Sequence, residues 1–125
     1  MNKRILTVVQ RICGTPSLVS EIIHEENEYY FAYKGHTMSI LQRDSGSIKS
    51  GPHSLFIYAN WNRTLRDLIS LLEDYSPEEH GLKIAEYDGR DVAPEWLAAL
   101  YRMIQDQDMN IDDIFDDILG GESAE

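Results

Sequence analysis

Carboxylates near the end of the chain are the residues whose type and spacing could support chemistry. Residues 106–117 place oxygen-bearing side chains at the positions 1, 3, 5, 7 and 12 that calcium-binding EF-hand loops use. These side chains belong to Asp106, Asp108, Asn110, Asp112 and Asp117. Position 6, where the sharp turn needs glycine, is Ile111, and position 12 is an aspartate instead of the usual glutamate. We therefore predict no metal site and no cofactor, and interpret this segment as a solvated acidic helix face.

Other signals of catalysis or metal binding are weak. The four histidines, His24, His36, His53 and His80, have no zinc-ligand spacing to one another or to the single cysteine. Cys13 lies on an apolar stripe, where cysteine is usually a packed core residue. The sequence has no Gly-x-Ser-x-Gly, phosphate-binding or dinucleotide-binding motif. We expect that the protein is not an enzyme.

Acidic residues are concentrated in the second part of the chain. Residues 1–55 contain six Lys/Arg and five Asp/Glu, whereas residues 56–125 contain five Lys/Arg and seventeen Asp/Glu. These balances of +1 and −12 make the net charge of −11, and residues 106–125 carry eight acids and no base. Such a surface repels nucleic acid and anionic membranes and attracts basic proteins.

The charge pattern indicates two groups of candidate partner-binding residues. The first group is Asp106, Asp108, Asp112, Asp113, Asp116 and Asp117, and the second is Glu73, Asp74, Glu78 and Glu79. Regularly spaced carboxylates can imitate phosphates opposite an Arg/Lys groove. We therefore expect a non-enzymatic inhibitor that engages a basic toxin, nuclease or nucleic-acid-binding protein, as an immunity protein, an antitoxin or an anti-defence nucleic-acid mimic. Direct binding of nucleic acid or membrane is not expected.

Two other classes of function remain open. The chain could be an acidic dimeric adaptor or secretion-type chaperone, whose sheet or apolar helix 94–104 holds a client segment or a second copy. A salt-insensitive dimer would favour this class over the inhibitor. The chain could also be an enzyme or small-ligand protein whose site is assembled only by the fold.

The expected compartment is the cytoplasm. One cysteine allows no intramolecular disulfide, which fits a reducing environment. The basic start is followed by an apolar run over residues 5–9 that is too short for a signal peptide. No stretch approaches the length of a membrane span. We expect a soluble protein.

Hydrophobic periodicity predicts most of the elements. Helical spacing predicts helices over residues 3–13, 65–75 and 94–104. Alternating and β-branched or aromatic residues predict strands over 18–24, 28–34, 37–42, 54–59 and 82–87. The Ser- and Gly-rich segment 43–53 is predicted to be a mobile loop.

These elements predict an α+β fold with the order α-ββββ-α-β-α-α. Sequential strands joined by short turns form an antiparallel meander, here of four to five strands, with the helices packed on one face. Residues 1–105 form a single domain, and residues 106–125 form an acidic C-terminal segment. A short amphipathic helix over 111–119 is expected to dock on the domain through its apolar stripe, because a helix this short is marginal alone.

Overall fold

The computed structural model describes residues 3–47, 51–74 and 81–123. Its elements are α1 (Lys3–Gly14), the 3₁₀ helix η1 (Pro16–Leu18), β1 (Val19–Glu25), β2 (Glu28–Tyr33), β3 (His36–Ser47), β4 (Gly51–Tyr58), α2 (Leu65–Asp74), β5 (Ile84–Tyr87), α3 (Pro94–Met109) and α4 (Ile111–Ser123). The predicted α+β class and element order are confirmed.

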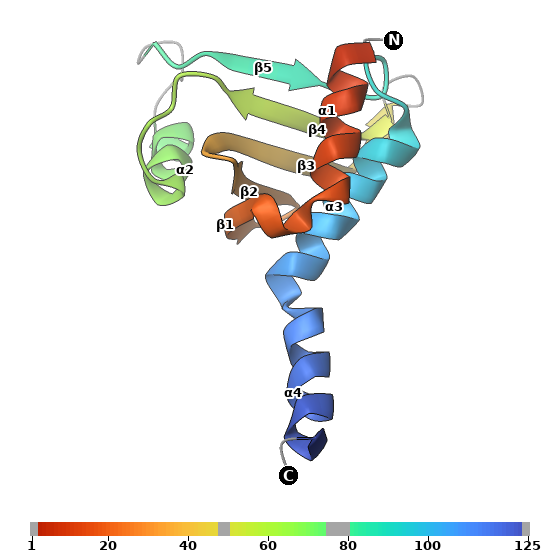
Figure 1. The fold of residues 1–125 in the computed structure, drawn as a ribbon. Helices are drawn as coiled ribbons and strands as arrows, with labels where there is room; N and C mark the ends of the chain where they lie inside the picture. The colour runs from red at the N-terminus through yellow and green to blue at the C-terminus, as the bar shows by residue number, and fades with distance from the viewer. Residues whose placement is uncertain (1–2, 48–50, 75–80, 124–125) are drawn as a thin grey trace.

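The five strands form one antiparallel sheet in the order β1-β2-β3-β4-β5, so each strand pairs with its neighbours in sequence (Figure 1). Tight turns permit this meander, and Gly35 has the positive φ of 81° that the β2–β3 turn needs. Edge strand β1 is interrupted by a bulge at Glu21, whose φ is 54°. The pairing of β1 with β2 therefore shifts register between Ser20 and Ile22.

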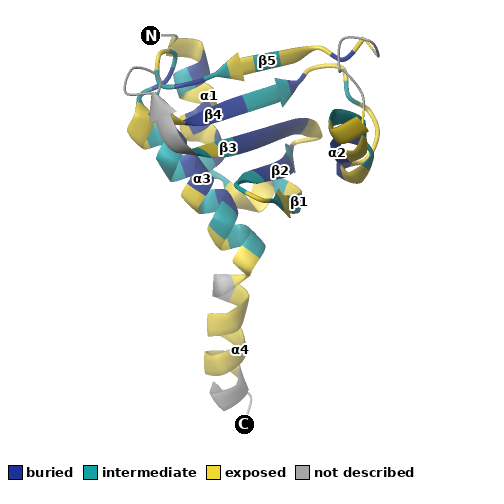
Figure 2. Ribbon diagram, turned by 180° about the vertical axis from the view of Figure 1, so that it is seen from behind, coloured by how far each residue is buried: buried dark blue, intermediate teal, exposed yellow. Residues whose placement is uncertain are grey.

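Helices α1 and α3 cover one face of the sheet (Figure 1). The buried residues of this layer come from both helices and from alternate positions of the strands. Fully buried members include Val9 and Ile12 of α1, Phe31 and Ile40 of the sheet, and Leu97, Leu100 and Ile104 of α3. Figure 2 shows this buried interior between the two helices and the central strands. This hydrophobic core between the helices and the sheet therefore fixes the N-terminal part of α3.

Helix α2 packs against the opposite face, so the expectation that the helices share one face is wrong for this helix. Its buried Leu65 and Leu68 form a separate cluster with Tyr30 and Tyr58. Tyr30 precedes Phe31, and successive side chains of a strand point to opposite faces. The physical reason lies in β2, whose run of tyrosine and phenylalanine supplies apolar surface on both sides of the sheet.

The β3–β4 hairpin is longer than predicted. Residues 43–47 and 51–53 of the expected loop lie in strands, and residues 48–50 are outside the described residues. Pairing continues to Ser47 and Gly51 after a register shift that follows Gln42. A cross-strand contact supports this extension, because the Arg43 guanidinium donates to the Ser54 hydroxyl. Local composition did not reveal this tertiary pairing.

Candidate partner-binding site

Helix α3 forms the base of the candidate site. Its first turns are buried in the core, whereas its last turns continue to Met109 beyond the predicted end near residue 105. The Gln107 side chain donates a hydrogen bond of 2.8 Å to the Pro16 carbonyl oxygen of η1. The predicted acids Asp106 and Asp108 therefore lie on a helix that the domain supports, Asp106 exposed and Asp108 half-buried.

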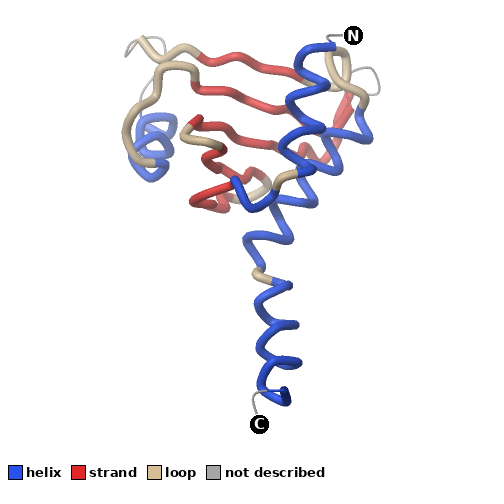
Figure 3. Tube along the Cα trace, in the orientation of Figure 1, coloured by secondary structure: helices blue, strands red, loops and turns tan. Residues whose placement is uncertain are grey.

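A single residue separates α3 from α4. Asn110 has a left-handed backbone, with φ 54° and ψ 42°, a conformation that asparagine tolerates better than most residues. Its N–H donates to the Gln107 carbonyl at 3.2 Å, and its carbonyl accepts from the Ile114 N–H at 3.0 Å. Figure 3 shows this short link between the two helices. Asn110 thus ends one helix and starts the next.

Helix α4 projects away from the sheet and the other helices as a C-terminal arm (Figure 1). The apolar side chains of the arm are exposed: Ile114 by 49%, Phe115 by 56%, Ile118 by 59% and Leu119 by 65%. We call these four residues the apolar stripe. The expectation that it docks on its own domain is therefore wrong in this structure. The reason is the turn at Asn110, which directs α4 away from the core.

The aspartates of the arm are also exposed. Asp113, Asp116 and Asp117 are all exposed to solvent. Asp112 also belongs to α4, but its side chain is outside the part of the chain that the structure describes. Helix α4 continues to Ser123, four residues past the predicted end at 119. Asp116 and Asp117 therefore lie in the middle of the helix, away from the unfavourable negative end of its dipole.

The second predicted group of acids lies elsewhere. Glu73 and Asp74 are exposed at the end of α2, and Glu78 and Glu79 are outside the described residues. Figures 1 and 2 place α2 at the far end of the sheet from the arm. The structure therefore does not bring Glu73 and Asp74 together with the aspartates of the arm.

A hollow of about 480 Å³ lies at the base of the arm. It is lined by Pro16, Ala99, Arg102, Met103, Asp106, Gln107, Asn110 and Asp113. Two predicted residues, Asp106 of α3 and Asp113 of α4, line this hollow together with Arg102. Sequence reasoning missed this hollow and Arg102. The sequence signal that could have indicated it is the spacing of Ala99, Arg102, Met103 and Asp106, which places them on one face of a helix.

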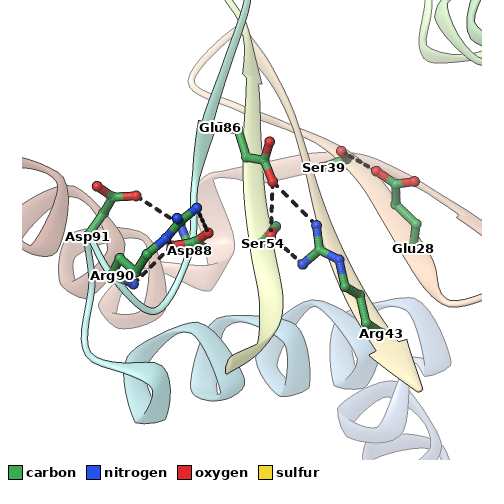
Figure 4. A network of polar contacts seen from close by, with 8 residues as sticks. All are labelled: Glu28, Ser39, Arg43, Ser54, Glu86, Asp88, Arg90 and Asp91. Atoms are coloured by element: carbon green, nitrogen blue, oxygen red, sulfur yellow. Dashed lines mark hydrogen bonds and ion pairs between the residues drawn. The ribbon is translucent and has the colours of Figure 1, made fainter. Parts of the chain in front are cut away.

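A polar network lies on the α2 side of the sheet (Figure 4). The Glu28 carboxylate accepts hydrogen bonds from the Tyr30 hydroxyl at 3.1 Å and the Ser39 hydroxyl at 2.6 Å. Burial, and then the neighbouring Glu28 charge, raise the pKa of Tyr30. Arg43 contacts Ser54 and pairs with Glu86 at 3.3 Å. These hydrogen bonds join strands β2, β3, β4 and β5 across this face of the sheet and satisfy its polar groups.

Two histidines lie at the ends of one run of aromatic contacts, because Tyr29 and Tyr101, which each contact one of them, are themselves 5.2 Å apart. His24 stacks on Tyr29 with ring centroids 4.2 Å apart, whereas His53 lies 5.3 Å from Tyr101, and His80 is outside the described residues. Burial, and then the Arg102 charge, lower the pKa of His53. The part of the chain that the structure describes contains no cluster of three or more His, Cys, Asp or Glu suited to a metal ion.

Comparisons with protein-family models, curated proteins and solved structures find no significant match to this chain. Among the described residues, none of the helices combines the length and the apolar character needed to cross a bilayer. The exposed acidic arm is the surface that separates most clearly from the packed domain.

Proposed function

We propose that the protein is a non-enzymatic inhibitor that binds a basic protein through its C-terminal arm. The observation that carries the proposal is the exposure of Asp113, Asp116 and Asp117 on a helix that projects from the domain. Asp106 adds a fourth exposed carboxylate at the base, and no Lys or Arg follows Arg102 in the sequence. The arm therefore presents one sign of charge to an approaching partner.

Helix geometry gives these carboxylates a repeat that suits a cationic groove. Residues three and four apart share a helix face, so Asp113, Asp116 and Asp117 are neighbours on the surface. Charges of this kind raise the rate of association and select the partner more than they raise affinity. The partner class is a toxin, nuclease or nucleic-acid-binding protein whose Arg/Lys groove the arm occupies. Occupation of that groove excludes the natural anionic substrate.

The exposed apolar stripe favours a second candidate function, a dimeric adaptor or secretion-type chaperone. An isolated helix of this length is marginal in water, and its stripe gains stability only when another surface covers it. A client segment or a second copy would provide that cover. This function predicts binding that salt weakens little, because apolar contacts are not screened.

Affinity capture from host lysate tests the inhibitor proposal. The bait is the full chain, compared with a variant in which Asp106, Asp113, Asp116 and Asp117 are changed to Asn. A matched control changes Glu73 to Gln and Asp74 to Asn on α2, which also removes exposed acids but leaves the arm intact. Each bait is used at about 0.05 M and about 0.5 M salt, because the screening length shortens with ionic strength.

The proposal predicts that the full chain and the α2 control capture the same basic protein at low salt. The arm variant should lose that protein, and high salt should release it. If the arm variant retains the protein at both salt concentrations, the acidic arm is not the binding site. Capture that persists at high salt and depends on the apolar stripe would instead favour the adaptor.

A further inference from the structure

The outer face of α1 is basic and uncovered. The helix carries Lys3, Arg4 and Arg11 and no acid. Its buried residues, including Val9 and Ile12, point into the core, whereas Lys3 and Arg11 are exposed on the other side. Within the described residues, Lys3 and Arg11 form no ion pair. No acid within α1 itself offsets these positive charges.

The same face of α1 has room for another element. A hollow of about 380 Å³ lies along it, lined by Thr7, Gln10, Arg11, Gly14 and Thr15. A Cβ placed at Gly14 would meet nothing within 4 Å, so the helix backbone is open there. Val8 on this helix is 37% exposed and Leu18 of η1 is 44% exposed. The open hollow is lined by polar side chains and glycine, and the exposed apolar side chains Val8 and Leu18 lie outside its lining.

The arm has the complementary properties. Helix α4 carries four aspartates and no base, and the apolar stripe is its largest exposed apolar surface. It has 13 residues and α1 has 12, which corresponds to helices of about 20 Å and about 18 Å. We propose that the arm of one copy docks along α1 of a second copy, with the apolar stripe against Val8 and the hollow and with aspartates beside Lys3 and Arg11.

A second copy is favoured over two other occupants. Pairing of two arms would bring like charges together, which opposes association. Return of the arm to α1 of its own chain would require a reversal of direction at the single residue Asn110, whereas the arm points away from α1 (Figure 1). Reciprocal exchange between two copies satisfies both arms in one closed dimer.

This inference is independent of the inhibitor proposal. On a helix, Asp113 lies opposite the apolar stripe, whereas Asp116 and Asp117 flank its edges, so docking through the stripe leaves the Asp113 side of α4 accessible. The dimer needs only the purified chain, whereas the inhibitor proposal needs the captured partner. Failure of one proposal therefore does not decide the other.

Sedimentation equilibrium of the purified full chain tests the dimer. The expected result is a concentration-dependent species of twice the 14.4 kDa chain mass. Phe115→Ser with Ile118→Ser should weaken the dimer at least about tenfold, since both side chains leave an apolar contact. The matched control is Ile84→Ser, which alters an exposed apolar side chain on β5 far from both helices and should change nothing. Far-UV circular dichroism checks that each variant is folded.

A charge exchange tests the identity of the docking surface. Arg11→Glu with Lys3→Glu should weaken the dimer about tenfold, and so should Asp116→Lys with Asp117→Lys, since these two acids flank the apolar stripe. A chain that carries both sets of changes should recover the dimer, because each new acid then faces a new base. A monomer at all concentrations overturns the proposal. A dimer that the apolar-stripe variant leaves intact, or one that the exchange does not restore, also overturns it.

Discussion

The Gln107 side-chain amide donates a hydrogen bond of 2.8 Å to the Pro16 carbonyl, across 91 residues of sequence. This contact joins the last turns of α3 to η1, where the arm leaves the domain. Both residues also line the hollow at the base of the arm. The direction of the arm therefore depends on a tertiary contact and on the turn at Asn110 that follows it.

Gln107→Leu should lower the free energy of unfolding by about 1 kcal/mol, because a hydrogen bond between elements is lost. Urea denaturation of the variant and the parent chain measures the difference. An unchanged denaturation midpoint would show that this bond does not support the base of the arm.

Substitutions at Asn110 should separate backbone conformation from side-chain chemistry. Asn110→Gly should keep the arm in its present direction, because glycine adopts a positive φ without steric cost. Asn110→Leu should disfavour the left-handed turn by about 1–2 kcal/mol and favour one continuous helix from α3 into α4. Small-angle scattering should then show a changed maximum dimension for the leucine variant only. Identical scattering from both variants would contradict this role of Asn110.

Asp88 should stabilise the turn before α3. It is 5% exposed and accepts hydrogen bonds from the Arg90 guanidinium at 2.8 Å and from the Arg90 backbone N–H at 2.9 Å (Figure 4). Asp88→Ala should cost about 1–3 kcal/mol, because donors in the turn lose their acceptor. Urea denaturation measures this loss, with exposed Asp74→Ala as a control that should be nearly neutral.

The contribution of Asp88 should also depend on pH. The hydrogen bond from Arg90 is the main cause that lowers the pKa of Asp88 below its ordinary value of 3.8. The folded state therefore favours the carboxylate, so this stabilisation is present above pH 3.8 and is lost as pH falls through the lower folded pKa. The parent chain and Asp88→Ala should converge in stability at acid pH. A constant difference at all pH values would contradict the assignment.

His53 should make the protein less stable in mild acid. Its side chain is buried, its Nδ1 has no hydrogen-bond partner, and burial lowers its pKa from 6.5. Between the folded pKa and 6.5 the unfolded chain binds more protons, so stability falls as pH decreases through this range. Unfolding measured between about pH 5 and pH 8 should show this loss, and His53→Leu should remove it. An equal pH slope in the leucine variant would contradict the prediction.

Local patterns were sufficient for the element order but not for the arrangement of every element. The alternation in β2 and the helical spacing of Leu65, Leu68 and Ile69 predict element types directly. The face that α2 covers is not predictable in this way, because β2 has aromatic side chains on both faces: Tyr29, Phe31 and Tyr33 on one and Tyr30 on the other. Likewise, the extension of β3 depends on its partner strand, because Ser and Gly have low intrinsic strand preference.

The candidate site shows the same limit. The acids of the arm are visible in the sequence. An apolar stripe, however, has the same sequence pattern whether it packs on its own domain or against another molecule. The turn at Asn110 resolves this ambiguity only in three dimensions. The hollow beside Arg102 is also a tertiary feature, because Pro16 and Asp113 reach it from distant parts of the chain.

The salt dependence of the affinity for the captured partner tests the central claim most directly. The dissociation constant is measured from about 0.05 M to about 0.5 M salt for the full chain and for the variant with Asn at positions 106, 113, 116 and 117. We predict weaker binding of the full chain at high salt, and both weaker binding and a flatter salt dependence for the variant. Equal dissociation constants and equal salt dependence for the two proteins would contradict the assignment of the acidic arm as the binding site.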